Sequence, residues 1–129
     1  MRVLPFLAIT LLACDPSVIT RLTVLPPSPY RGADVDSLAV TIARELSAAH
    51  GLHPSSGDAT CTGGLYEAVD FSGHPVGLAL CVVLARPAKP ELQVQEAITS
   101  RWGPKGDSLR RELRDSLVTH FGRGAVRVR

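Results

Sequence analysis

Residues 76–86, VGLALCVVLAR, form an almost unbroken apolar run, and this stretch decides the expected fold. Side chains alternate between the two faces of a β-strand. Large side chains therefore fall on one face (Val76, Leu78, Leu80, Val82 and Leu84) and smaller ones on the other (Gly77, Ala79, Cys81, Val83 and Ala85). A run this apolar is typical of a central strand. We expect its large face to be covered by helices.

Further strands are expected on both sides of this run. Residues 65–71 (LYEAVDF) precede it, and SGHP at 72–75 supplies the turn residues of a hairpin. Residues 18–25 and 125–129 have the character of strands at the two ends of the chain. In residues 91–99 (ELQVQEAIT), Leu92, Val94 and Ile98 alternate with polar neighbours, which indicates an antiparallel strand with one wet face. Residues 50–64 are expected to form a loop rich in serine and glycine.

Two stretches have the spacing of amphipathic helices. Residues 34–50 place apolar side chains at three- and four-residue intervals, with Asp34 or Asp36 as N-cap and Gly51 as the stop. Residues 108–121 repeat the pattern through Leu109, Leu113, Leu117 and Phe121, with Asp107 as cap and Gly122 as stop. The order β-α-β-β-β-α-β predicts an α+β two-layer sandwich, with both helices on one face of a mostly antiparallel sheet.

The N-terminal residues have the features of an export signal. Arg2 follows the initiator methionine, and the apolar stretch 3–12 (VLPFLAITLL) is too short to span a membrane stably. Leu11-Leu12-Ala13-Cys14 resembles the lipobox of bacterial lipoproteins. The resemblance implies that residues 1–13 are a signal peptide removed before Cys14, and that Cys14 carries diacylglycerol and, on its amino group, a further acyl chain such as palmitate.

The alternative is an ordinary secretory leader, or a first buried strand in which Cys14 is a core thiol. On the lipoprotein interpretation, residues 14–17 are a lipidated terminus with a short tether, and residues 18–129 are a single α+β domain held against the membrane. Asp15 resembles the signal that retains enterobacterial lipoproteins in the inner membrane. We therefore expect a periplasm-facing protein of the bacterial cell envelope, with the inner membrane slightly favoured.

Lipidation of Cys14 would leave the pair Cys61 and Cys81, which an oxidising compartment favours joining. A hairpin centred on Gly73-His74 places Cys81 opposite Tyr66, with Cys61 about 17 Å further along and on the other face. A disulfide needs Cα atoms within about 7 Å. The bridge therefore requires the chain to turn back at Gly63-Gly64; otherwise Cys81 is a buried thiol and Cys61 a loop thiol.

Catalytic and metal-binding signatures are weak. His50, His53, Asp58 and Cys61 are possible ligand types without the tight framework of a structural zinc site. Cys61 or a serine of HPSSGD (Ser55, Ser56) lacks the local context of an activated nucleophile. No dinucleotide or phosphate-loop motif is present in the sequence. We expect no cofactor, no metal and no catalysis.

Charge is unevenly distributed along the chain. Residues 14–100 hold five basic and nine acidic side chains, whereas residues 101–129 hold eight basic and three acidic ones. The basic set could form a patch for anionic lipid headgroups or an acidic partner: Arg101, Lys105, Arg110, Arg111, Arg114, Arg123, Arg127 and Arg129. The alternative is a solvated helix face with an Arg111–Asp115 pair. Trp102 is expected to pack in the core rather than to serve as an exposed anchor.

These observations predict a membrane-anchored envelope lipoprotein with a non-catalytic structural, assembly or partner-binding role. Its partners would be the membrane and an envelope protein; export argues against nucleic acid. Such an architecture loosely resembles the lipopolysaccharide-assembly and transporter-associated lipoproteins. The alternative is a periplasmic binding module for a small or anionic envelope ligand, and an envelope hydrolase is a third, weaker interpretation.

Overall fold

The computed structural model describes residues 17–25, 32–86, 88–97 and 101–129. Cys14, Asp15 and the rest of the expected leader and tether lie outside these residues, apart from Ser17. Within the described ranges, six strands form one antiparallel sheet in the order β2-β3-β4-β5-β1-β6. The strands are β1 (Ser17–Val24), β2 (His53–Ser55), β3 (Gly64–Val69), β4 (Pro75–Val83), β5 (Glu91–Ala97) and β6 (Val126–Val128).

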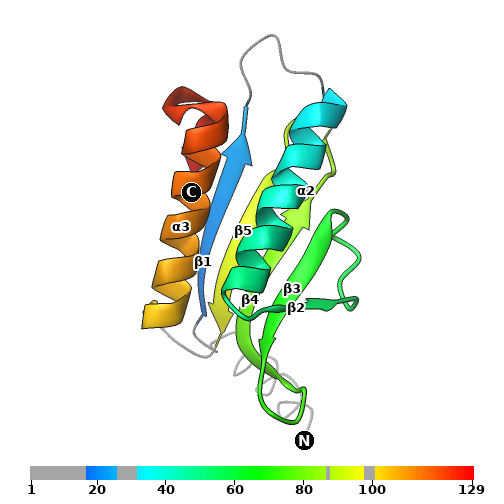
Figure 1. The fold of residues 1–129 in the computed structure, drawn as a ribbon, viewed down its shortest axis with the longest axis vertical. Coiled ribbons are helices and arrows are strands. Elements are labelled where there is room, and N and C mark those ends of the chain that lie inside the picture. Colours follow the sequence, from blue (N-terminus) through cyan, green and yellow to red (C-terminus); the bar gives the residue numbers. More distant parts are fainter. Residues whose placement is uncertain (1–16, 26–31, 87, 98–100) are drawn as a thin grey trace, which may run out of the picture.

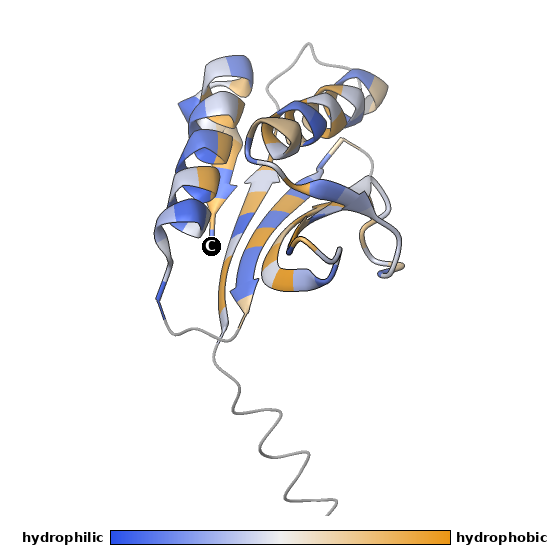
Figure 2. Cartoon of the chain, turned by 60° about the horizontal axis from the view of Figure 1, so that its bottom comes forward, coloured by the Kyte–Doolittle hydropathy of each residue, from blue (hydrophilic) through white to orange (hydrophobic). Residues whose placement is uncertain are grey.

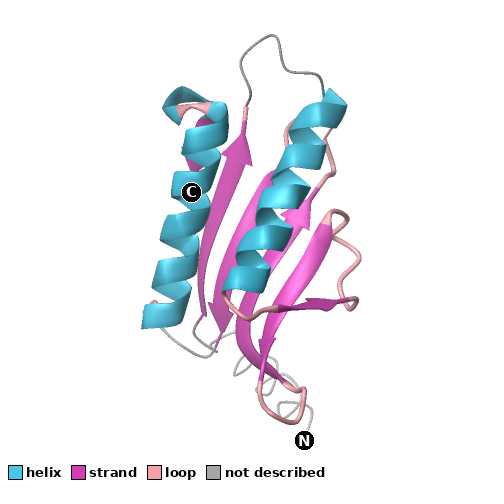
Figure 3. Ribbon diagram, in the orientation of Figure 1, coloured by secondary structure: helices cyan, strands magenta, loops and turns pink. Residues whose placement is uncertain are grey.

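Helices α2 (Gly32–Ala49) and α3 (Pro104–Phe121) lie side by side on one face of this sheet (Figures 1 and 3). Helix α2 packs over β3 and β4, and α3 packs over β1 and β5. A short 3₁₀ turn, η1 (Arg123–Ala125), leads from α3 into β6. The protein is therefore the expected α+β two-layer sandwich, with β4 in the interior of the sheet.

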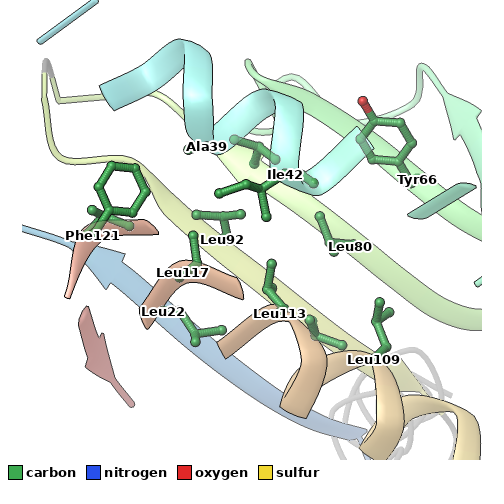
Figure 4. Packing of buried hydrophobic residues seen from close by; sticks show 14 of the residues in the cluster. Leu22, Ala39, Ile42, Tyr66, Leu80, Leu92, Leu109, Leu113, Leu117 and Phe121 are labelled. Atoms are coloured by element: carbon green, nitrogen blue, oxygen red, sulfur yellow. The ribbon is translucent and has the colours of Figure 1, made fainter. Parts of the chain in front are cut away.

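The core lies between the helices and the large face of the central strands (Figure 4). Leu80 and Val82 of β4 are fully buried there, and Leu78 nearly so, as the alternation of large and small residues predicts. The apolar stripe of α3 and the inward residues of its neighbours complete the cluster: Leu22, Val24, Val35, Ala39, Ile42, Leu92, Val94, Leu109, Leu113, Leu117 and Phe121. Alternating apolar and polar bands are visible along the strands (Figure 2).

Three local predictions were wrong in detail. Residues 53–55 form an exposed edge strand, β2, inside the expected loop; its Pro54 is tolerated because edge strands need fewer backbone donors. Helix α2 begins at Gly32, so Asp34 and Asp36 lie within the helix and not at its N-cap. The expected cap at Asp107 is also wrong, because α3 begins at Pro104 with Gly103 as its N-cap.

The start of α3 explains why Asp107 is not the cap. Glu96 at the end of β5 reaches the helix N-terminus, where its Oε1 accepts a hydrogen bond from the Gly103 N–H at 2.8 Å. This carboxylate meets the positive end of the helix dipole. Asp107 sits one turn further on, bonded to Arg110 at 2.5 Å and to Arg111 at 2.8 Å. The expected Arg111–Asp115 pair is thus replaced by Arg111–Asp107.

Candidate functional site

The face of the sheet away from the helices is not covered by any described helix, and it holds the candidate site. Inward and outward residues alternate, so Gln93 and Gln95 of β5 face outward between the buried Leu92 and Val94. Cross-strand pairing sets Gln95 beside Ala79 of β4. Glu67 of β3 lies opposite Ala79. Small and polar side chains thus line the middle of this face, which we call the open face.

A disulfide ties a loop to the open face. Cys61 and Cys81 are bonded, with their Cα atoms 5.2 Å apart. The chain turns back where the Gly64 N–H donates to the Cys61 carbonyl at 3.0 Å, and the Gly63 N–H donates to the Val82 carbonyl at 2.9 Å. Of the two alternatives left open for these cysteines, the structure contains the bridge, reached by the turn at Gly63-Gly64.

The expected register of the hairpin was wrong by one residue. Cys81 lies opposite Leu65 and not Tyr66. The turn is centred on Ser72 and not on Gly73-His74, and beyond it three β4 residues, 76–78, stand against the single residue Ala68 of β3. The two departures together give the shift, and Gly77 within the irregularity has a φ of +92°. A one-residue slip exchanges the faces of a strand. Leu65 and Cys81 therefore share the open face, within reach of Cys61.

Glycine is required where the loop meets the sheet. A Cβ atom added at Gly63 would lie 2.6 Å from Cγ1 of Val82 and 3.0 Å from Cγ of Leu84. The Thr62 hydroxyl also accepts a hydrogen bond from the Leu84 N–H at 2.9 Å. We call residues 56–63 the stapled loop. Its close backbone approach, this bond and the Gly63 N–H bond to the Val82 carbonyl hold it against β4.

Between the stapled loop and the sheet lies a hollow of about 360 Å³, which we call the acidic hollow. Its floor is low because small side chains occupy the strands there, including Gly77, Ala79 and Ala97. Glu67, Gln93 and Gln95 bring polar groups to it, and Asp58 of the stapled loop forms part of its rim. The site thus offers two carboxylates and two amides beside the apolar surfaces of Leu65 and the disulfide.

Asp58 is held as a carboxylate. Its Oδ1 accepts hydrogen bonds from the Thr60 hydroxyl and from the Thr60 N–H, the latter at 2.9 Å. Both bonds favour the charged form, so the pKa of Asp58 lies below its ordinary value of 3.8, with the hydroxyl bond as the larger cause. The rim of the hollow therefore keeps its negative charge through the whole physiological range.

A second hollow, of about 370 Å³, lies at the other end of the open face, and we call it the cationic hollow. Its charged lining residues are Arg86, Lys89, Glu91 and Arg129. Glu91 receives Arg129 at 2.6 Å on one oxygen and the Gln93 amide at 2.7 Å on the other. The lining thus contains one carboxylate and three cationic side chains.

Arg21 adds to this excess of positive charge. Its backbone exchanges hydrogen bonds of 3.0 and 2.8 Å with that of Arg129, and it lies between the buried Thr20 and Leu22. Both arginines therefore project from neighbouring strands on the open face, where like charges repel and the Glu91 carboxylate that binds Arg129 offsets part of the repulsion. Arg21, Arg86 and Lys89 were not among the predicted site residues. The alternation of β1 was the signal that could have placed Arg21.

The predicted basic patch is not a single surface. Lys105 lies in the first turn of α3, Arg114 lies two turns further on and Arg123 lies beyond its C-terminus. Arg110 and Arg111 are bonded to Asp107, and Arg101 precedes the helix. Only Arg127 and Arg129 lie on β6 and its end, beside the cationic hollow. Residues near in sequence were separated because α3 and β6 run on different layers.

Trp102 follows the core interpretation. It is half-buried and packs against the hydrophobic core. The guanidinium of Arg110 lies over its ring at 5.2 Å from the centroid. Such cation–π contacts stabilise modestly when partly exposed. Trp102 therefore fixes the start of α3.

The candidate metal and nucleophile residues do not converge. His50 Nε2 lies 2.7 Å from Glu112 Oε2 and links the end of α2 to α3. His53 pairs with Glu67 across β2 and β3, and Cys61 is consumed by the disulfide. Ser55 and Ser56 are exposed. Among the described residues, no three histidine, cysteine, aspartate or glutamate side chains are placed to hold a metal ion.

Comparisons with known proteins add no relative. No family model matches the chain, and neither a curated protein nor a solved structure matches it. In the part of the chain that the structure covers, no helix has the length and apolar character needed to cross a membrane.

Proposed function

We propose that this protein is a membrane-anchored lipoprotein of the bacterial cell envelope, tethered through Cys14 and facing the periplasm, with a non-catalytic role. In this proposal the open face binds an envelope protein partner. The anchor rests on the lipobox-like residues 11–14. The inner membrane is slightly favoured because of Asp15.

The Cys61–Cys81 disulfide is the observation that carries the proposal. Disulfides persist in oxidising compartments and are rare in the bacterial cytosol. Here the bond also shapes the candidate site, since it holds the stapled loop as one wall of the acidic hollow. A site that depends on a disulfide is consistent with a protein that works outside the cytoplasm.

The open face supports a binding role. Helices cover the other face, and the exposed strands present amides, carboxylates and guanidinium groups in place of a closed core. Acidic groups gather at one hollow and basic groups at the other. Complementary charge on a partner would set its orientation on this surface, because electrostatic complementarity contributes mainly to specificity and association rate.

A second candidate function is a binding module for a small anionic envelope ligand. The cationic hollow favours it, because its lining holds three cationic side chains, Arg86, Lys89 and Arg129, and a single carboxylate, that of Glu91. Two substitutions, Arg86→Glu and one at Gln95, separate the two functions. Arg86→Glu would abolish binding of a small anion, whereas a protein partner seated on the whole open face would also lose affinity on substitution of Gln95, in the acidic hollow.

The anchor is tested by the intact mass of the full-length protein recovered from bacterial membranes, beside Cys14→Ser. We expect the loss of residues 1–13 and the addition of acyl chains, both abolished by the substitution. Thiol alkylation with and without reduction, in the same experiment, counts the cysteines in disulfides. An unlipidated product in the wild type would overturn the anchor.

The binding face is tested by photo-crosslinking in living cells. A photoreactive residue at Gln95, on the open face, is compared with one at Arg114, on the exposed side of α3. A discrete crosslinked protein at position 95 and none at 114 supports the proposal. The reverse pattern would place the partner on the helices.

A further inference from the structure

The hairpin between β3 and β4 carries the most exposed large apolar side chain among the described residues. Phe71, at its tip, is fully exposed, and Val76 beside it is 57% exposed. The tip also carries Asp70 and His74, whose side chains approach to 3.9 Å. An aromatic ring held entirely in water is costly, because its apolar surface stays hydrated.

The turn that presents Phe71 is firmly built. Asp70 Oδ1 accepts hydrogen bonds from the Ser72 N–H at 2.8 Å and from the His74 N–H at 3.0 Å. The Gly73 N–H donates to the Asp70 carbonyl at 3.0 Å, and Gly73 has the positive φ, +85°, that this turn requires. Phe71 therefore projects from an ordered tip.

Strand pairing places this tip beyond the start of β1. Ser17 pairs with Ala97. A Cβ atom added at Gly77 would lie 3.3 Å from the Ala97 carbonyl oxygen, so Gly77 is level with both. From Gly77 the hairpin continues four residues to Gly73, at most about 13 Å at ~3.3 Å per residue. The tip and the start of β1 lie at the same end of the molecule (Figure 1).

The chain length before Ser17 matches this projection. Cys14 lies three positions before Ser17, a reach of at most about 10 Å. Acyl chains on Cys14 would therefore bring the bilayer surface to the level that the hairpin tip reaches. Helix α3 begins at the same end (Figure 1), and its first turn holds the exposed Lys105, whose charge suits anionic headgroups.

We propose that the β3–β4 hairpin is a second membrane contact, in which Phe71 enters the lipid interface beside the acyl chains of Cys14. The inference rests on the proposed lipid anchor and adds an orientation to it. Apolar side chains that include Phe are buried at the boundary between headgroups and acyl chains when a protein lies on a membrane. Because the lipid anchor and the hairpin tip lie at one end, the long axis of the sheet points away from the bilayer. The cationic hollow, at the other end, then faces the periplasm.

The test uses the full-length, lipidated protein in vesicles of phosphatidylglycerol and phosphatidylcholine with brominated acyl chains, which quench tryptophan on contact. Trp102 is the only tryptophan, so Trp102→Phe provides the silent background. Phe71→Trp then reports on the tip. Val128→Trp, at an apolar position 50% exposed on β6, is the matched control. Mass spectrometry of each sample first establishes acylation of Cys14.

We expect the emission at position 71 to fall by roughly half and that at position 128 to stay nearly constant, as for a ring seated about 5–10 Å into the interface. Acylated protein with no quenching at position 71, or with equal quenching at both positions, overturns the hairpin contact and leaves the anchor standing. A mass without acyl chains overturns the anchor itself, and the hairpin contact with it.

Discussion

The two faces of the sheet use the same strands for different purposes. On the helix face, Leu22, Leu80 and Leu92 are fully buried and lock the two layers together. On the open face, their neighbours in the chain are Arg21, Ala79 and Gln93, which are partly exposed and polar or small. The helix face holds the fold together, and the open face has few large apolar side chains to hide.

The difference shows how a small domain can leave one face of a sheet bare. The open face has no helix of its own among the described elements. Instead, the Cys61–Cys81 bond holds the stapled loop against part of it. A disulfide stabilises mainly by restricting the unfolded chain, so it needs little buried apolar surface. The cysteine pair therefore stabilises the open face while its polar groups remain accessible.

The largest expected effect comes from breaking the helix face. Leu80→Ala should lower the free energy of unfolding by about 2–5 kcal/mol, because it removes a fully buried side chain and leaves a cavity. Gln95→Ala, on the open face of the adjacent strand, should change it by less than about 0.5 kcal/mol. Urea denaturation of both variants measures the contrast. Equal losses would contradict the division between the faces.

Removing the disulfide should rank second. The bridge closes a sequence separation of 20 residues, and Cys61→Ala with Cys81→Ala should cost about 3 kcal/mol. Denaturation with and without a reductant is the measurement: reduction should destabilise the wild type by a similar amount and leave the double variant unchanged. A wild type insensitive to reduction would show that the disulfide contributes nothing to stability.

A smaller effect is expected where the layers meet at the start of α3. Glu96→Gln keeps an acceptor for the Gly103 N–H but removes the charge at the helix N-terminus. The loss should be about 0.3–1 kcal/mol and should shrink as salt is added. Thermal unfolding at low and high ionic strength provides the measurement. A loss that is unaffected by salt would assign Glu96 a packing role and not an electrostatic one.

The smallest effect belongs to the rim of the acidic hollow. Hydrogen bonds from Thr60 lower the pKa of Asp58. These bonds therefore help to order the loop at pH values above 3.8, the ordinary pKa of aspartate, and their contribution is lost as the pH falls through the lowered pKa. The amide signal of Thr60 in an NMR titration should move in that acidic range. Asp58→Asn should abolish the movement, and a midpoint above 3.8 would contradict the geometry.

Periodicity predicted the parts of the fold that depend on burial. The size alternation of residues 76–84 identified the central strand and its helix-facing side, and the stripe from Leu109 to Phe121 identified α3. The apolar side chains were sufficient there because each element buries a single face. Element order, except for the short β2, followed from the same reasoning.

Features made by residues distant in sequence were not predicted. Glu96 at the start of α3 depends on tertiary contact, and the hairpin register depends on an irregularity around Gly77 that no local pattern marks. The cationic hollow draws Arg86, Lys89 and Arg129 from separate segments. The basic residues of the predicted patch are divided among α3, η1 and β6, which nearness in sequence does not reveal.

The pairing of β1 also has a kinetic consequence. This strand is the first described element to be synthesised, yet its partners are residues 91–97 of β5 and residues 126–128 of β6. Pairing between strands so far apart in sequence slows folding, because the chain loses the entropy of closing the loop before the contacts form. During synthesis one edge of β1 must remain unpaired until residues 126–128 have been made. Removing only the last four residues would leave that edge open in the finished protein, where it could template aggregation.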